Sequence, residues 1–240
     1  VDPLSEDNKM FIGVGPLTGT LFPGAARVNF TAKSPQTNIL GDSNTGGFLG
    51  PEIKFAGFDQ IILEGKADQL SYIYIKDGKA EIRSAKHLKQ LDTFETQEKI
   101  KEELGDSRVQ IASIGPAAEN GVKYSGIFCN MVRAAARTGM GLVLASKNIK
   151  AIAVRGTRDL GAKKPDKFKT LIDKMDQEIK NHSEYEIRTR LGTTQLVSSL
   201  NELGCLATRH FQTGYFEAGD KVSGEYLEEN HKQQEKGCFA

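Results

Sequence analysis

Two stretches of the sequence repeat one pattern, and this repetition decides the expected fold. The first reads TGGFL at 45–49 and leads to IILEG at 61–65; the second reads TGMGL at 138–142 and leads to IAVRG at 152–156. Each places a glycine-rich turn before a lysine and a strand that ends in glycine. The match predicts an internal duplication with two similar turns related by a pseudo-twofold. Such a pair of turns suits two copies of one ligand.

The residues before Gly156 predict an α+β domain. Runs of β-branched and apolar residues predict strands at 10–14, 26–33, 60–64, 70–75, 80–83, 109–114 and 151–155. Asp77-Gly78 predicts a hairpin turn, because glycine adopts positive φ at low cost. One helix is expected over 93–104, with Thr93 as its N-cap and Gly105 at its end.

The apolar spacing becomes helical in the last third of the chain. After Pro165-Asp166, apolar residues recur every three or four positions up to Ile179. Further helices are expected from about residue 193 to 203 and from 223 to 234. We therefore divide the chain into an α+β domain at 1–160 and a region at 161–240 that begins an all-α domain.

Composition excludes several classes of protein. The 240 residues include 38% hydrophobic ones, enough for a core, and 32 Lys+Arg against 31 Asp+Glu leave a net charge of +1. Nucleic-acid and anionic-membrane binders carry a basic excess, so neither partner is expected. No apolar run approaches the roughly 18 residues of a membrane span. The first residue is Val1 rather than Met, so we treat the sequence as a fragment.

The cysteines indicate a reducing compartment. Cys129, Cys205 and Cys238 lie far apart, and an odd number of them in a long chain is not a disulfide framework. We therefore expect a cytoplasmic protein. Apolar neighbours around Cys129 and Cys205 predict that both are buried as small hydrophobic residues.

Two candidate anion sites combine glycines with arginines. The first joins Arg27 to residues 42–47, and the second covers 133–141, with arginines at 133 and 137. Glycine lets backbone N–H groups approach an anion closely, and a guanidinium adds bidentate phosphate contacts. Ordinary glycine turns with solvated arginines are the alternative explanation for both.

Common catalytic motifs are missing from the sequence. GVGP at 13–16 lacks the third glycine of a dinucleotide fingerprint, and no Walker or GxSxG sequence occurs. The four histidines have no metal-ligand spacing, so we expect them at the surface. Glu64 and Glu119 lie near glycines and are candidate acids or bases, although carboxylates there are more often solvated or bonded to backbone N–H groups.

Several further runs are specific in combination. They are VDPLS at 1–5, GPLTGT at 15–20, KSPQT at 33–37, SNTGG at 43–47, IKFAGFD at 53–59, EGKA at 64–67, IGPAAEN at 114–120 and SKNIKAIAV at 146–154. With these runs the chain resembles the tungsten-containing aldehyde:ferredoxin oxidoreductase family over nearly its whole length. The resemblance implies an N-terminal domain of two β-sheet halves on which a tungsten (or molybdenum) bis-molybdopterin cofactor rests.

The resemblance also implies site residues. Arg27, Asn44 and Gly46 would contact one pterin, and Arg133, Ala134, Ala136 and Arg137 the other. The backbone carbonyls of Asn44 and Ala134 would hold a Mg²⁺ that links the pterin phosphates, since a hard cation prefers oxygen ligands. Cys238 would open the family's C-x-x-C-x-x-x-C run and bind a [4Fe–4S] cluster, which needs four thiolates. No catalytic residue is expected within this fragment.

Four positions depart from the family pattern. Ala118, Ala136, Thr138 and Ala145 stand where the family usually has glycine. Added Cβ atoms there would crowd a ligand or oppose positive φ, at about 1 kcal/mol or more per strained site.

The resemblance implies an enzyme that oxidises aldehydes to carboxylic acids and passes electrons through the cluster to ferredoxin. A same-family alternative is the catalytic subunit of a tungsten-dependent aromatic acyl-CoA reductase. An alternative of another class is a scaffold that kept the fold and lost the cofactor. A homodimer is one assembly consistent with the resemblance, and the oligomeric state stays open. The isolated fragment is expected to be inactive.

Overall fold

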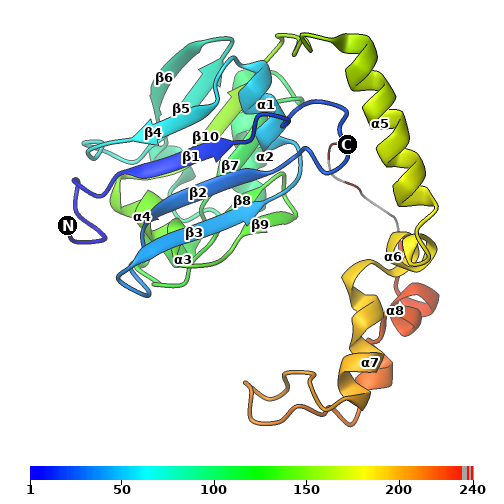
Figure 1. Ribbon diagram of the computed structural model, residues 1–240. Coiled ribbons are helices and arrows are strands. Elements are labelled where there is room, and N and C mark those ends of the chain that lie inside the picture. Colours follow the sequence, from blue (N-terminus) through cyan, green and yellow to red (C-terminus); the bar gives the residue numbers. More distant parts are fainter. Residues whose placement is uncertain (234–236, 238, 240) are drawn as a thin grey trace. The chain divides into compact units, whose positions relative to one another are not determined.

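The computed structural model describes residues 1–233, 237 and 239 (Figure 1). The chain divides into two units, Val1–Lys163 with Gly237–Ala240, and Lys164–Lys236. The first unit contains two β-sheets. The strands are β1 (Met10–Val14), β2 (Val28–Lys33), β3 (Leu40–Thr45), β4 (Gln60–Leu63), β5 (Ser71–Lys76), β6 (Lys79–Ser84), β7 (Gln110–Ser113), β8 (Ile127–Cys129), β9 (Arg133–Ala135) and β10 (Ile149–Arg155).

Short helices connect these strands. The helices of the first unit are η1 (Lys86–Leu88), α1 (Leu49–Phe55), α2 (Thr93–Leu104), α3 (Pro116–Glu119) and α4 (Met140–Ser146). We predicted no strand or helix for seven of these elements: β3, β8, β9, η1, α1, α3 and α4. Helices α1 and α4 have seven residues each and begin close to the glycine-rich turns.

The strand order confirms the predicted duplication. The first sheet has the order β3-β2-β1-β4, and part of the second has the order β9-β8-β7-β10. Neighbouring strands are antiparallel in both. Because α1 joins β3 to β4 and α4 joins β9 to β10, each half repeats one β-β-β-α-β unit. The hairpin β5–β6 extends the second sheet, where β5 pairs with β10 in parallel.

The main core unites the two halves. Apolar side chains from both sheets and from α1 and α4 form one buried cluster, which includes Phe30, Ile53, Met140 and Ile152. Burying such a side chain contributes about 1.5–3 kcal/mol. A second cluster lies between α2 and the second sheet, around Tyr72 and Ile100. The fold is therefore α+β, as the sequence predicted.

Helix α2 has the predicted bounds, and only its N-cap differs from the prediction. Asp92, not Thr93, is the N-cap: its Oδ1 accepts hydrogen bonds of 2.8 Å from the N–H groups of Phe94 and Glu95. The Glu95 carboxylate accepts a hydrogen bond from the Asp92 N–H in return, which completes a capping box. The expected Gly105 ends the helix with a φ of 62°.

A buried ion pair joins β10 to α3. The ammonium group of Lys150 in β10 is fully buried and contacts the carboxylate of Glu119. It also donates a 2.8 Å hydrogen bond to the carbonyl of Leu91. Glu119 Oε2 accepts a hydrogen bond of 3.0 Å from the Gln90 N–H. Glu119 therefore serves as the buried partner of Lys150, which accounts for this carboxylate without a role as acid or base.

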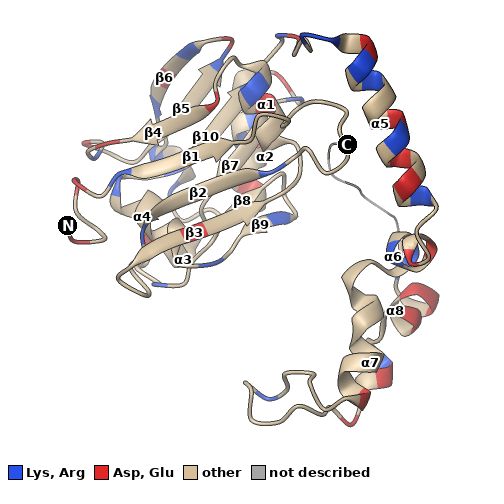
Figure 2. Ribbon diagram, in the orientation of Figure 1, with Lys and Arg blue, Asp and Glu red and all other residues tan. Residues whose placement is uncertain are grey.

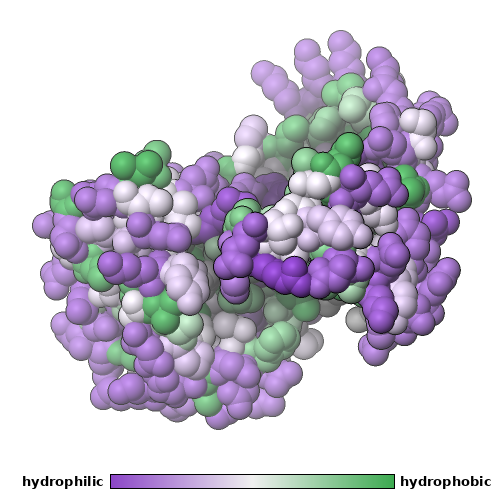
Figure 3. Space-filling model, turned by 90° about the horizontal axis from the view of Figure 1, so that it is seen from below, coloured by the Kyte–Doolittle hydropathy of each residue, from purple (hydrophilic) through white to green (hydrophobic). Residues whose placement is uncertain are grey.

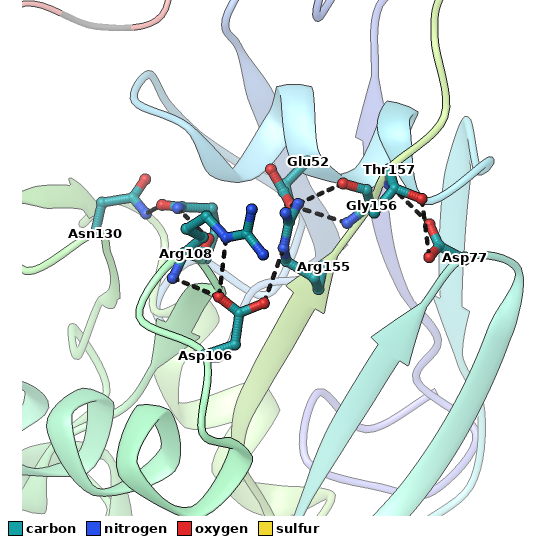
Figure 4. Close-up of polar contacts among 9 residues, drawn as sticks. Glu52, Asp77, Asp106, Arg108, Asn130, Arg155, Gly156 and Thr157 are labelled. Atoms are coloured by element: carbon teal, nitrogen blue, oxygen red, sulfur yellow. Dashed lines mark hydrogen bonds and ion pairs between the residues drawn. The ribbon is translucent and has the colours of Figure 1, made fainter.

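A polar network ties α1 to the second sheet (Figure 4). Arg155, at the end of β10, donates a 2.7 Å hydrogen bond to Glu52 of α1 and one of 3.1 Å to Asp106. Asp106 also accepts hydrogen bonds from the N–H and the guanidinium of Arg108. These bonds, led by the one from the Arg108 N–H, lower the pKa of Asp106 to about 2.

The second unit is helical. Its helices are α5 (Pro165–Lys180), α6 (Tyr185–Leu191), η2 (Gly192–Gln195), α7 (Leu196–Glu202), η3 (Gly219–Val222) and α8 (Gly224–Asn230). Helix α5 carries charges of both signs along its length (Figure 2). None of its residues is buried, and Leu171 and Ile179 are exposed. On the face in Figure 3, hydrophilic residues dominate and hydrophobic ones form smaller groups between them. No helix among the described residues is long and apolar enough to cross a membrane.

The lowered pKa of Asp106 predicts a pH-dependent stability. A carboxyl group whose pKa is lower in the folded state stabilises the fold above its unfolded pKa, and this contribution disappears as the pH falls toward the folded value. We expect Asp106→Asn to lower the free energy of unfolding by about 2 kcal/mol near neutral pH. The difference in the free energy of unfolding between the wild type and Asp106→Asn should narrow between about pH 4 and pH 2. Urea unfolding of both proteins over this pH range measures this difference. A difference that stays constant with pH would contradict the lowered pKa of Asp106.

Candidate functional site

Five of the predicted site residues line one pocket in the first unit. Arg27 precedes β2, Asn44 lies in β3, Gly46 follows β3, and Arg133 and Ala134 begin β9. The pocket has a volume of about 390 Å³ and is lined by Gly24, Ala26, Arg27, Asn44, Thr45, Gly46, Val132, Arg133 and Ala134. Its walls therefore come from both halves of the duplicated fold.

Asn44 and Ala134 occupy corresponding positions in the two halves. In the first sheet Val28 pairs with Thr45 and Asn29 with Asn44. In the second, Ile127 pairs with Ala135 and Phe128 with Ala134. Asn44 pairs with the second residue of β2, and Ala134 pairs with the second residue of β8. The backbones of Asn44 and Ala134 thus occupy equivalent places in the two halves.

Direct contacts hold the two halves together beside the pocket. The Arg137 N–H donates a 3.1 Å hydrogen bond to Ser43 Oγ in β3. The Ser34 hydroxyl donates one of 2.8 Å to the carbonyl of Thr138. Strand β3 of the first sheet and strand β9 of the second lie side by side (Figure 1). These contacts join the two halves next to the pocket.

The pocket is electropositive. Two arginines and no Asp or Glu occur among the residues that line it. Arg27 Nη1 donates a 2.9 Å hydrogen bond to Asn44 Oδ1, which orients both side chains. A guanidinium has five N–H donors, so Arg27 keeps others for a ligand. The arrangement suits a phosphate-bearing ligand.

A helix glycine makes the same close approach in each half. A Cβ on Gly50 of α1 would lie 3.0 Å from the carbonyl oxygens of Ala26 and Arg27. A Cβ on Gly141 of α4 would lie 2.5 Å from the Gly126 oxygen and 2.8 Å from that of Ser125. These contacts set each helix against the residues that precede β2 and β8. In the first half, that segment carries Arg27.

Strain is confined to one of the four positions that depart from the family glycines. Thr138 has a φ of 58°, which is unfavourable for a β-branched residue. Ala118 and Ala145 lie in α3 and α4, and Ala136 is not among the residues with positive φ. An alanine Cβ is therefore compatible with the backbone at these three positions.

The remaining predicted residues lie elsewhere or outside the described structure. Ala136 and Arg137 are exposed and do not line the pocket. Cys238 lies outside the described residues. Phe239, its neighbour in sequence, packs against Phe48 and Phe55 with ring centroids 6.2 Å and 5.9 Å away, and its N–H donates a 3.4 Å hydrogen bond to the Gly47 carbonyl.

The burial predicted for Cys129 is confirmed, that for Cys205 is wrong, and the exposure predicted for the histidines is confirmed. Cys129 is buried, as expected, and burial raises the pKa of its thiol to about 12. The prediction for Cys205 is wrong: this residue is exposed, because it follows α7 in a loop of the second unit. All four histidines are exposed, as predicted. Among the described residues, no three His, Cys, Asp or Glu side chains form a group that could hold a metal ion.

The pocket fits part of a phosphate-bearing pterin cofactor. Its volume of about 390 Å³ is near the lower end for small-molecule sites, enough for a charged arm of such a ligand but not for two whole pterins. The two guanidinium groups supply the donors that phosphates need. Backbone carbonyls from β3 and β9 are oxygen donors of the kind that Mg²⁺ prefers.

Sequence comparison decides the family. Residues 1–156 match "Aldehyde ferredoxin oxidoreductase, N-terminal domain", and residues 170–240 match "Aldehyde ferredoxin oxidoreductase, domains 2 & 3". The chain belongs to the aldehyde ferredoxin oxidoreductase family. This confirms the resemblance drawn from the sequence runs.

Relatives in this family share sequence over the full chain. Tungsten-containing aldehyde ferredoxin oxidoreductases of Pyrococcus abyssi and Pyrococcus furiosus are 44% and 42% identical over all of this chain, which spans 40% of their length. A solved structure, the active site complex BamBC of benzoyl coenzyme A reductase with 1,5-dienoyl-CoA, is 42% identical with a TM-score of 0.75. The match covers 77% of this chain and 28% of that one.

The two helix glycines predict unequal effects of the same substitution. Gly141→Ala should destabilise the protein by about 1–3 kcal/mol, because its Cβ would overlap backbone oxygens that cannot move aside. Gly50→Ala is the matched control: its contacts are longer, and the gain of about 1 kcal/mol in helix propensity offsets them. Thermal unfolding of both variants compares them, and equal stabilities would show that the close approach at α4 is not limiting.

Proposed function

We propose that this chain forms part of an enzyme that oxidises aldehydes to carboxylic acids and passes the electrons through a [4Fe–4S] cluster to ferredoxin. The single observation that carries the proposal is the electropositive pocket lined by both halves of the duplicated fold, with Arg27 and Arg133 on its walls. Relatives named as tungsten-containing aldehyde ferredoxin oxidoreductases support the choice of reaction.

The residues of this chain would bind and orient a tungsten or molybdenum bis-pterin cofactor. Arg27 and Arg133 would neutralise phosphate charge, and the corresponding carbonyls of Asn44 and Ala134 would hold a Mg²⁺ between two phosphates. Gly46 would let the backbone approach one pterin, while Ala136 and Arg137 would contact the other. When bound, the cofactor would supply the redox chemistry, which side chains cannot perform.

Cys238 is proposed as one thiolate ligand of the cluster. Phe239 supports this role, because it follows Cys238 in the sequence and contacts the turn after β3 through Phe48 and the Gly47 carbonyl. A cluster needs four thiolates, and the resemblance implies that the others belong to the cysteine run that Cys238 opens and to a cysteine further downstream.

A catalytic subunit of an aromatic acyl-CoA reductase is the second candidate. The benzoyl coenzyme A reductase complex shares 42% identity and a TM-score of 0.75 with this chain. The pocket of the first unit serves both functions equally, because it would contact the cofactor rather than the substrate. Substrate choice must therefore come from parts of the protein outside this chain.

Metal and pterin analysis of the full-length protein tests cofactor binding. Purified without oxygen, it should contain tungsten or molybdenum at about one atom per chain and iron at about four. Arg27→Ala should lower the pterin and metal content, because one phosphate loses its bidentate donor. Arg83→Ala, on the opposite edge strand β6, is the control and should retain both. A folded wild-type protein without metal or pterin would favour the cofactor-free scaffold, and full retention by Arg27→Ala would exclude the role of that residue.

Substrate assays separate the two enzyme functions. An aldehyde oxidoreductase should reduce ferredoxin or a viologen dye when an aldehyde is added. It should not oxidise reduced dye when an aromatic acyl-CoA thioester is added. The opposite pattern, dye oxidation by benzoyl-CoA without aldehyde turnover, would establish the second candidate. Both assays use the same anaerobic preparation, and boiled enzyme gives the background rate.

A further inference from the structure

Asn130 connects the two halves of the fold at the turns beside the pocket. It lies between β8 and β9 with a φ of 51°, a conformation that asparagine adopts more readily than most residues. Its side-chain Oδ1 accepts a 2.9 Å hydrogen bond from the N–H of Phe48, which precedes α1 in the other half. One side chain thus links the hairpin before Arg133 to the turn after β3.

The other end of the Asn130 amide is also held. Its Nδ2 donates a hydrogen bond to the Gln110 side chain, whose Nε2 donates one of 2.6 Å to the Arg108 carbonyl. Arg108 contacts Asp106, Asp106 accepts from Arg155, and Arg155 donates to Glu52 in α1 (Figure 4). The polar chain therefore starts at Phe48, before the first residue of α1, and returns to the same helix at Glu52.

Close packing reinforces this link. Gly47 has a φ of 105°, and a Cβ there would lie 2.8 Å from Asn130 Oδ1 and 3.3 Å from Cγ of Arg133. On the other side, the Met131 N–H donates a 3.1 Å hydrogen bond to the buried side chain of Gln97. The turn after β3 and the β8–β9 hairpin are thus in contact, and neither can shift without moving Asn130.

We infer that Asn130 is a positioning residue that sets the separation between the two walls of the pocket. One wall carries Gly46 and Asn44, and the other carries Arg133 and Ala134. Asn130 lines neither wall, yet it bonds directly to the turn of the first and lies three residues before Arg133 in the second. This inference rests on the proposed function, since the separation matters only for a ligand that spans both walls.

The test compares two asparagines in corresponding turns. Asn38, with a φ of 62°, lies between β2 and β3, just as Asn130 lies between β8 and β9. Asn130→Gly and Asn38→Gly each remove an amide side chain and keep the freedom for positive φ. In the full-length protein, pterin and tungsten retained after long anaerobic dialysis should fall roughly two- to tenfold for Asn130→Gly, because the substitution removes the hydrogen bond to the Phe48 N–H that joins the two walls, together with the bond to Gln110. Asn38→Gly should match the wild type.

Two further variants separate positioning from general stability. Asn130→Asp keeps an oxygen that accepts from the Phe48 N–H, so it should restore most of the retained pterin. Gln110→Ala should also lower the amount of pterin retained, because it removes the hydrogen-bond partner of the Asn130 Nδ2 group. If Asn130→Gly fails to fold, this variant tests the inference in its place. Equal retention by Asn130→Gly and Asn38→Gly would overturn the inference. A wild-type protein without pterin would instead overturn the proposed function.

Discussion

The close approach of two helix backbones to the carbonyls just before β2 and β8 organises the first unit. Gly141 donates its N–H to the Ser125 carbonyl over 3.0 Å, and a Cβ at this glycine would overlap the oxygens of Ser125 and Gly126. Gly50 makes the corresponding approach in the other half. Because α1 and α4 contribute to the core shared by both sheets, these contacts determine how deeply the helices lie. The same contact at Gly50 fixes the backbone of Arg27, so core packing and pocket geometry are set together.

Patterns that repeat in the sequence revealed the architecture, while tertiary contacts determined its details. The IILEG and IAVRG stretches occupy corresponding positions of β4 and β10, so this part of the repeat correctly predicted the duplication. TGGFL and TGMGL do not correspond residue for residue, because the glycines that approach backbone carbonyls are Gly50, just after the first stretch, and Gly141, inside the second. Strand β3 was missed because LGDSNT at 40–45 has little β-propensity; it forms because β2 pairs with all six of its residues. Helices α1 and α4 are too short to show helical periodicity. The cap of α2 was misplaced by one residue, since Thr93 and Asp92 are both good N-caps.

The site could be predicted only as far as local motifs and family resemblance reach. Arg27, Asn44 and Arg133 stand beside glycine-rich runs that the resemblance singles out. Asn130 carries no such signal, because its partner Phe48 is 82 positions away in the sequence. Its positive φ depends on the hairpin it occupies, which a single sequence does not reveal. Residues that act by joining two halves of a fold are in general invisible until the halves are placed.

The two halves of the duplication differ at the residues that line the pocket. The register of the strands makes Gly126 the counterpart of Arg27, and Ser43 the counterpart of Arg133. Each half thus contributes one arginine, but from different positions of the repeat. A strictly symmetric arrangement would place a second arginine at position 126 or at position 43. The asymmetric pair instead lines one pocket, while the corresponding carbonyls of Asn44 and Ala134 keep the symmetry of the backbone. The pocket therefore combines one arginine from each half with a strand backbone that keeps the register of the repeat.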